Sequence, residues 1–162
     1  MAEVLELGRS LAQAFEPKRA FRWIVEIEGI DTFLAESMSR PKFDVDETES
    51  RYINTVAYYA GRVTPQTLPL ALKDAIAPSQ TQKCTEWMRA VYEQETGRAG
   101  YKVMYSKTVT IKMLSPTLEV VEKWDLENAW PVNIDPSDLT YMDSDLARVT
   151  LTLRFDRALL RF

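Results

Sequence analysis

The chain has 162 residues, of which 46% are hydrophobic and 27% are charged, a composition typical of one soluble globular domain. It contains no histidine and one cysteine, Cys84, which excludes Ser-His-Asp and Cys-His catalytic systems, histidine metal sites and an intramolecular disulfide. The net charge of -4 argues against a basic surface that grips nucleic acid, and no apolar run reaches the roughly 18 residues that span a bilayer.

Residues 1–17 are expected to form an N-terminal arm of a single domain that spans residues 1–162. Apolar residues at helical spacing between Glu3 and Phe15 predict a short amphipathic helix, which Pro17 ends. The alternative is a frayed arm that orders only against a neighbouring molecule, as chain ends often do. The arm lacks the basic, apolar and small-residue segments of a signal peptide, so we expect a cytoplasmic product.

The next segments predict strands. Residues 21–27 alternate, Gly29 lies in a turn and residues 32–38 begin a return strand, which together predict a β-hairpin. Residues 41–53 predict a long strand that is polar on both faces, one of which contains Asp44, Asp46, Thr48 and Ser50. Asp44, Asp46 and Glu47 could offer oxygen ligands to a metal. A solvated strand face is favoured, because the turn glycine and distal glutamate of an EF-hand are missing.

Residues 54–63 predict a loop with a glycine hinge and two adjacent aromatic residues. Exposed aromatic side chains are typical of contact surfaces. The residues of this loop that we expect to make contacts are Asn54, Tyr58, Tyr59 and Arg62. Residues 66–72 alternate again, but Pro65 and Pro69 predict a strand that lies at a sheet edge or pairs only partly within its own subunit.

Residues 81–94 predict a helix. Ser79 and Gln82 are spaced as in a capping box. The apolar stripe contains Cys84 and Tyr92 and, as its core face, Trp87, Met88 and Val91. We expect Cys84 to pack in the core and not to act as a nucleophile, because nothing in the sequence points to a lowered pKa. Residues 103–114 predict a further strand.

The C-terminal third predicts two more strands. Residues 119–124 suit a strand packed partly on both faces, and Pro131 is expected to stop it, since proline cannot donate to a ladder. After two turn clusters rich in aspartate, residues 148–156 alternate, with Val149, Leu151, Leu153 and Phe155 on one face. The predicted fold is α+β, a mainly antiparallel β-sandwich or barrel with one flanking helix.

The sequence offers little for catalysis. Nucleotide-binding glycine motifs, a P-loop, a zinc-peptidase motif and a C-x-x-C pair are all missing. We therefore predict no catalytic residue, no metal site and no cofactor, and a protein that binds copies of itself. The alternatives of another class are a small metal- or ligand-binding β domain and a carboxylate hydrolase, whose acid pair no sequence spacing can assign.

The run WDLENAWP at residues 124–131 resembles the W-x-(V/L)-x-N-A-(F/W)-P segment of phage tail tube proteins. These proteins form the inner tubes of contractile tails and are related to Hcp-like and extracellular injection-system tube proteins. Residues 149–157 look like the last strand of that family, and the resemblance is looser elsewhere, above all in residues 40–62. Within the motif, we expect a structural bend locked by aromatic packing at Trp124, Asn128, Trp130 and Pro131.

The resemblance implies a hexameric ring whose sheets join into one barrel around a channel, with rings stacked into a tube. We expect residues 54–63 to mediate stacking, and Asp44, Asp46, Thr48 and Ser50 to line the channel, because short acidic and polar side chains leave room and repel phosphate. The implied partners are the tail sheath, baseplate and tail-terminator proteins, with tape-measure protein and DNA held in the channel without sequence-specific binding. No membrane partner is implied.

The implied location is the tail of a phage virion, assembled in the host cytoplasm. Two related functions stay open. One is the inner tube of a phage-derived injection system that delivers protein effectors, and the other is a tube-initiator protein of the baseplate.

Overall fold

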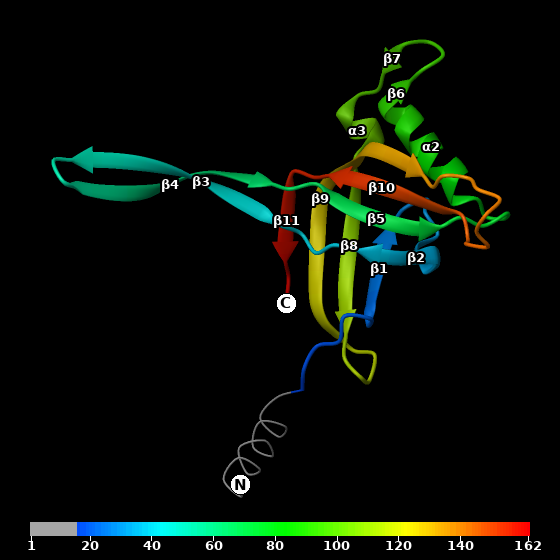
Figure 1. Cartoon of the computed structure of the whole chain (residues 1–162), viewed down its shortest axis with the longest axis horizontal. Helices are drawn as coiled ribbons and strands as arrows, with labels where there is room; N and C mark the ends of the chain where they lie inside the picture. Colours follow the sequence, from blue (N-terminus) through cyan, green and yellow to red (C-terminus); the bar gives the residue numbers. More distant parts are fainter. Residues whose placement is uncertain (1–15) are drawn as a thin grey trace, which may run out of the picture.

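In the computed structural model, which describes residues 16–162, a bent antiparallel sheet lies beside one long helix, and a two-stranded hairpin projects away from both (Figure 1). The predicted fold class, α+β with mainly antiparallel strands and one long helix, is confirmed. The helix predicted within residues 3–15 lies outside the described residues.

Within residues 16–162, seven strands form the sheet in the order β1-β8-β9-β10-β5-β2, with β11 paired to β9. They are β1 (Trp23–Ile27), β2 (Ala35–Met38), β5 (Leu68–Lys73), β8 (Lys107–Leu114), β9 (Val120–Pro136), β10 (Arg148–Arg154) and β11 (Arg157–Leu160). β1 and β2 lie at opposite ends of this order and do not pair. The described strands therefore do not close into a barrel within one subunit.

β9 serves both halves of the sheet because it bends. Its first part pairs with β8 and β11, and its last part, from Trp130 on, pairs with β10. Asn128 has a φ of 54°, in the left-handed region that asparagine tolerates, and the register with β8 shifts beside it. The predicted stop at Pro131 is therefore wrong. β9 runs on to Pro136, and Pro131 is accommodated where the register with β10 shifts.

The period-two patterns of β1, β5, β8 and β10 are confirmed as buried faces. The side chains concerned are Val25, Ile27, Leu68, Leu70, Leu72, Val109, Ile111, Val149, Leu151 and Leu153. They form one core cluster that joins the two halves of the sheet and includes Cys84 and Trp87 of the helix. Full burial of each such aliphatic side chain stabilises the fold by about 1.5–3 kcal/mol, so this core fixes the bend of the sheet.

The predicted hairpin of residues 21–38 is wrong. β1 pairs with β8 and β2 pairs with β5, so the two strands belong to different halves of the sheet. The chain crosses between them through a turn at Gly29, whose φ is 81°, and the 3-10 helix η1 (Thr32–Leu34). Both edges thus stay unpaired among the described strands.

The predicted edge position of β5 is also wrong, because β5 lies between β10 and β2. Pro69 is tolerated there for a local reason. Its carbonyl accepts a hydrogen bond from the Ser39 amide at 3.4 Å, just past the end of β2 at Met38. Since the nitrogen and carbonyl of one residue face the same side of a strand, the missing N–H of Pro69 falls beyond the β2 ladder.

The predicted helix is confirmed as α2 (Gln80–Val91), which packs on β9 and β10. It ends earlier than predicted, since Tyr92 begins β6 (Tyr92–Glu93), which pairs with β7 (Arg98–Ala99). The strand predicted from residue 103 starts at Lys107, because residues 102–105 form the short helix α3 (Lys102–Tyr105). The Trp87 indole N–H donates to the Tyr105 carbonyl at 2.7 Å and ties α3 to α2.

The predicted loop of residues 54–63 is wrong. β3 (Phe43–Tyr52) and β4 (Thr55–Pro65) pair as an antiparallel hairpin around a turn at Ile53 and Asn54. The valine, threonine and tyrosine residues of β4 favour a strand. Gly61 is no hinge and lies at a β-bulge, where an added Cβ would approach the Asp46 carbonyl oxygen to 2.9 Å.

Candidate assembly surfaces

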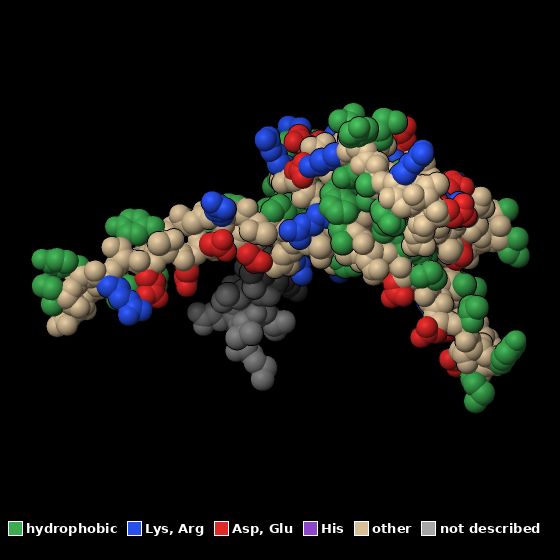
Figure 2. Space-filling model, turned by 90° about the horizontal axis from the view of Figure 1, so that it is seen from above, with side chains coloured by type: hydrophobic (Ala, Val, Ile, Leu, Met, Phe, Trp, Pro, Cys, Tyr) green, Lys and Arg blue, Asp and Glu red, His purple; other side chains and the backbone are tan. Residues whose placement is uncertain are grey.

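The β3–β4 hairpin is exposed along nearly its whole length. Every residue from Lys42 to Thr64 is exposed, so the hairpin makes little contact with the body of the same subunit beyond its base. Figure 2 shows the hairpin as a separate arm with hydrophobic side chains at its tip. A two-stranded hairpin alone is marginally stable in water, so this arm is suited to packing against another molecule.

The two faces of the hairpin differ in character. Strand alternation and the cross-strand register place Thr48 with Tyr59 on one face and Glu49 with Tyr58 on the other. The first, which we call the polar face, includes Asp44, Asp46, Thr48, Ser50, Tyr52, Thr55, Ala57, Tyr59 and Thr64. The second, which we call the apolar face, includes Phe43, Val45, Val56, Tyr58, Ala60 and Val63, together with Glu47 and an ion pair between Glu49 and Arg51 at 2.6 Å.

The two faces of the hairpin separate the residues predicted to line a channel from some of those predicted to mediate stacking. The four residues predicted to line a channel lie together on the polar face. The two tyrosines predicted to mediate stacking lie on opposite faces, because they are adjacent in a strand. Of the other residues predicted to make contacts, Asn54 lies in the turn and Arg62 lies beside the bulge.

The tip of the hairpin has an unusual backbone. Ile53 has a φ of 50° and is 84% exposed. The left-handed region costs an L-residue about 1–2 kcal/mol, and a β-branched residue rarely adopts it. Backbone strain is often found at functional sites, so a strained residue with an exposed apolar side chain at the end of this arm points to a contact surface.

The WDLENAWP motif joins three parts of the fold. Trp124 packs against the core, donates its indole N–H to Glu122 at 2.7 Å, and lies 6.5 Å from the ring of Phe43 at the base of the hairpin. The Asn128 side chain donates to Asp156 at 2.9 Å across the bend of β9. Trp130 contacts Tyr105 of α3 edge to face, with ring centroids 5.9 Å apart, and Pro131 is buried.

We expect replacement of Trp130 by alanine to lower the free energy of unfolding by about 3 kcal/mol. This is the low end of the range for aromatic truncations, because the indole is only partly buried. Val132→Ala on the same strand, where the side chain is 45% exposed, is the matched control and should cost well under half as much. Urea unfolding followed by circular dichroism measures both, and equal midpoints for the two variants would contradict a structural role of Trp130.

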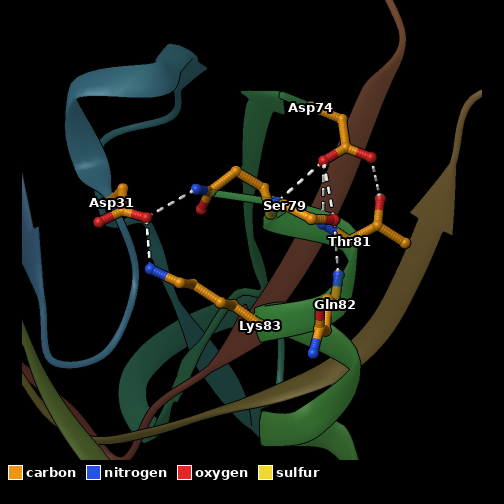
Figure 3. Close-up of polar contacts among 7 residues, drawn as sticks. Asp31, Asp74, Ser79, Thr81, Gln82 and Lys83 are labelled. Carbon is orange, nitrogen blue, oxygen red and sulfur yellow. Dashed lines mark hydrogen bonds and ion pairs between the residues drawn. The ribbon is translucent and has the colours of Figure 1, made fainter. Parts of the chain in front are cut away.

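The start of α2 is capped by more than the predicted serine. Ser79 accepts from the Gln82 amide at 3.3 Å, as the capping spacing predicts. The Asp74 carboxylate accepts from the Gln80 and Thr81 amides at 2.8 and 3.2 Å and from the Thr81 hydroxyl at 2.7 Å (Figure 3). Burial alone would raise the pKa of Asp74, but these hydrogen bonds outweigh it and lower the pKa.

A second carboxylate joins α2 to the crossing segment. The Asp31 carboxylate accepts a hydrogen bond from the Gln80 side chain at 3.1 Å and forms an ion pair with Lys83 (Figure 3). The hydrogen bond from Lys83 is the main cause that lowers the pKa of Asp31. Asp31 therefore ties the turn before η1 to the first turn of α2. Cys84, one turn further along α2, is buried, and this burial raises the pKa of its thiol to about 11. The predicted packing role of Cys84 is confirmed.

Sequence reasoning missed a buried carboxylate at the start of β9. Glu122 is 7% exposed and lies 2.5 Å from the Lys18 ammonium and 3.9 Å from the Arg40 guanidinium. Burial would raise its pKa, but the hydrogen bonds from Lys18 and Trp124 lower it overall. Lys18 and Arg40 are far away in the sequence, so no local pattern could reveal this cluster.

The arrangement of the acidic residues in the described part of the chain differs from that of a metal site. Within residues 16–162, no three histidine, cysteine, aspartate or glutamate side chains are grouped to hold a metal ion. Glu47 lies on the opposite face of β3 from Asp44 and Asp46, because alternate residues of a strand face opposite ways. In the same part of the chain, no helix combines the length and apolar character that crossing a bilayer requires.

Comparison with known proteins gives a consistent result. The model of the family described as "T4-like virus tail tube protein gp19" matches residues 19–158. The comparison with curated proteins found no match.

Several solved structures share the fold. A sheath/tube terminator of an extracellular contractile injection system has 18% identity and a TM-score of 0.75, with 91% of this chain and 99% of that chain covered. The tube-terminating cap of the anti-feeding prophage has 19% identity and a TM-score of 0.74, with coverage of 91% and 92%. Hcp1 from Flavobacterium johnsoniae has 10% identity and a TM-score of 0.52, with coverage of 87% and 95%.

The expected kinship with tail tube, injection-system and Hcp-like proteins is thereby confirmed. The family model covers most of the chain, including the WDLENAWP motif and the last strands. This chain belongs to the T4-like virus tail tube protein gp19 family, whose members are structural tube proteins and not enzymes.

Proposed function

We propose that this chain is the structural subunit of the inner tail tube of a contractile phage, that its copies close into hexameric rings, and that stacked rings enclose a channel for DNA. The observation that supports this most is the β3–β4 hairpin, whose side chains are exposed on both faces. An arm of this length has no role in the core of a single subunit. In a tube it would pack against neighbouring subunits.

The open edges of the sheet support assembly as well. Among the described strands, β1 pairs only with β8, β2 only with β5, and β11 only with β9. Unpaired strand edges are ready templates for another strand, and closure around a ring removes them. The backbone groups of these edges would then find partners in neighbouring subunits, so the isolated chain is an incomplete unit.

The polar face of the hairpin suits the channel, and the apolar face suits subunit contacts. Apart from Lys42 at the base of the hairpin, the polar face offers mainly threonine, serine and aspartate, which do not attract phosphate, because binding through counterion release requires lysine or arginine. Val45, Val56, Tyr58 and Val63 on the apolar face would gain from burial against a neighbour. We assign the tip and Tyr58 to ring stacking, and we place the sheath, baseplate and terminator proteins on the outside and ends of the tube.

A second candidate function is a tube or tube terminator of an extracellular injection system. Two injection-system terminating proteins match almost end to end. A tube subunit stacks ring upon ring, whereas a terminator or a baseplate initiator ends or starts one tube. A purified tube subunit should therefore assemble beyond a single ring, whereas a purified terminator or initiator should not.

Negative-stain electron microscopy with sedimentation velocity over a range of concentrations tests the proposal. We expect rings that grow into tubes as the concentration rises. Single rings that never stack would favour the terminator or initiator function. A monomer at every concentration would overturn the proposal.

The assignment of the channel leads to a prediction about charge. Replacing Asp44 and Asp46 with lysine should leave tubes intact and slow DNA ejection, more severely at low ionic strength, because exposed charges are screened by salt. Glu28→Lys with Glu119→Lys is the matched control, since it makes the same change of charge at two exposed residues outside the hairpin. The ejection rate of reconstituted particles is the readout, and equal rates for both variants at low salt would refute the assignment.

A further inference from the structure

The loop between β9 and β10, residues 137–147, has no packing role in its own subunit. Its apolar side chains Leu139, Tyr141, Met142 and Leu146 are 92%, 109%, 91% and 63% exposed. Its charged residues are Asp138, Asp143 and Asp145, with no lysine or arginine. We call this segment the acidic loop. In Figure 2, the end of the molecule opposite the hairpin has hydrophobic and acidic side chains together.

The base of the acidic loop is held in place although its tip is exposed. The Ser137 amide donates to the Arg148 carbonyl at 2.8 Å, and the Arg148 amide donates to the Ser137 hydroxyl at 3.1 Å. The Arg148 guanidinium binds Glu36 at 2.6 Å, and the Ala147 carbonyl accepts from the Asp74 amide at 2.9 Å. A loop anchored in this way presents its apolar tip with a smaller entropic cost of binding.

A complementary surface lies around α3. A cavity of about 440 Å³ is lined by two basic residues, Lys102 and Arg154, by one acidic residue, Asp156, and by Tyr105 and Trp130, among others. We call it the basic pocket. Beside it, Tyr101, Val103 and Met104 are 84%, 88% and 76% exposed, and residues 98–107 contain three basic residues and no acidic one. Among the described ion pairs, Lys102 binds Asp156 at 2.5 Å and Arg154 has no partner.

We propose that the acidic loop of one copy of this chain docks on the basic pocket of the next copy. The two surfaces are complementary, since each combines exposed apolar side chains with a net charge of opposite sign: the loop has only acidic charges, and in the pocket Lys102 and Arg154 outnumber Asp156. Each would bury the apolar groups that the other leaves in water. Asp138, Asp143 and Arg154, which have no partner among the described ion pairs, would find partners across the contact, whereas Asp145 lies 4.0 Å from Arg148 of its own subunit.

The placement of the two surfaces fits a closed ring. Figure 1 shows the β9–β10 loop at the end of the body away from the hairpin, whereas α3 and the end of β10 lie on the hairpin side of α2. A loop and a pocket on different sides of one subunit make a head-to-tail contact, which closes into a ring when the rotation permits. The inference rests on the proposed function, since it names a contact within the ring.

Charge reversal tests the contact. The loop variant is Asp138→Lys with Asp143→Lys, and the pocket variant is Lys102→Glu with Arg154→Glu. Each variant alone should need at least about tenfold more protein to assemble, because like charges then face each other. An equimolar mixture of the two should recover assembly, because reversed loops meet reversed pockets and normal loops meet normal pockets. Arg154→Glu alone keeps the ion pair between Lys102 and Asp156 and serves as a second pocket variant.

Sedimentation velocity and microscopy give the result, with circular dichroism melting to show that each variant is folded. Loss of rings in each folded variant and their return in the mixture would establish the contact. Folded variants that assemble like the unmodified chain, or a mixture that stays unassembled, would overturn it. If the unmodified chain forms no rings, the proposed function itself fails, which separates the two outcomes.

Discussion

Replacing Tyr58 and Tyr59 with alanine will leave the subunit folded and abolish long tubes. Both side chains are more than 60% exposed, at 63% and 61%, so their removal opens no cavity in the core. A buried tyrosine at an interface contributes about 2 kcal/mol or more to binding. In the proposed hexameric ring this loss would be repeated at every subunit of each stacking contact, so the effect on tube length should be large.

The single variants separate the two faces of the hairpin. Tyr58 lies on the apolar face with Val56, and Tyr59 lies on the polar face opposite Thr48. We expect Tyr58→Ala to shorten tubes far more than Tyr59→Ala, because the apolar face is the one suited to burial. Tyr92→Ala outside the hairpin, where the side chain is 49% exposed, is the matched control. Tube lengths measured by electron microscopy give the result, and a double variant with normal tubes would remove the hairpin tyrosines from ring stacking.

Replacing Asp74 with alanine should lower the free energy of unfolding by about 2–4 kcal/mol at neutral pH. The change removes the acceptor for two amides and a hydroxyl at the start of α2, and hydrogen bonds to a charged group contribute about 1.5–3 kcal/mol each when a partner is lost. The total is smaller than the sum of these hydrogen bonds, because water at this partly exposed site and the remaining cap, Ser79, would replace part of the lost hydrogen bonding. Asp74→Asn, which keeps one oxygen acceptor, should cost less than Asp74→Ala.

The effect of Asp74 depends on pH in a definite direction. The pKa of its carboxyl is lowered in the folded protein from the ordinary value of 3.8. A lowered pKa means that the stabilisation is fully present above pH 3.8 and is lost as the pH falls through the folded pKa. Urea unfolding of Asp74→Ala and the unmodified chain should therefore differ most near neutral pH and converge in strong acid. A difference that grew on acidification would contradict this account.

The sequence alone determined which faces are buried and which family the chain belongs to. The alternation of residues 149–155, the positions of Cys84 and Trp87 on the buried face of α2 and the capping position of Ser79 depend on neighbours along the chain, so periodicity predicts them. Tyr92, which periodicity also placed on this face, lies outside α2 and is 49% exposed. The WDLENAWP run and the last strand pointed to tail tube proteins before any fold was known. In the structure, Trp124 contacts Phe43 and Trp130 contacts Tyr105, and the structural role of the motif stays a prediction.

Only the tertiary structure decided how the strands pair. The sequence predicted a loop at residues 54–63, because two adjacent tyrosines near a glycine show no alternation of apolar and polar residues. In the structure this segment, from Thr55 on, belongs to β4. An arm exposed on both faces leaves no such pattern for the sequence to reveal. The continuation of β9 past Pro131 depends on a bulge at Asn128, which pairing with β8, β10 and β11 stabilises. Likewise, β1 pairs with β8 more than eighty residues away and not with β2, its neighbour in sequence. Pairing and register are set by the free energy of contacts between distant segments, and local propensity does not contain that information.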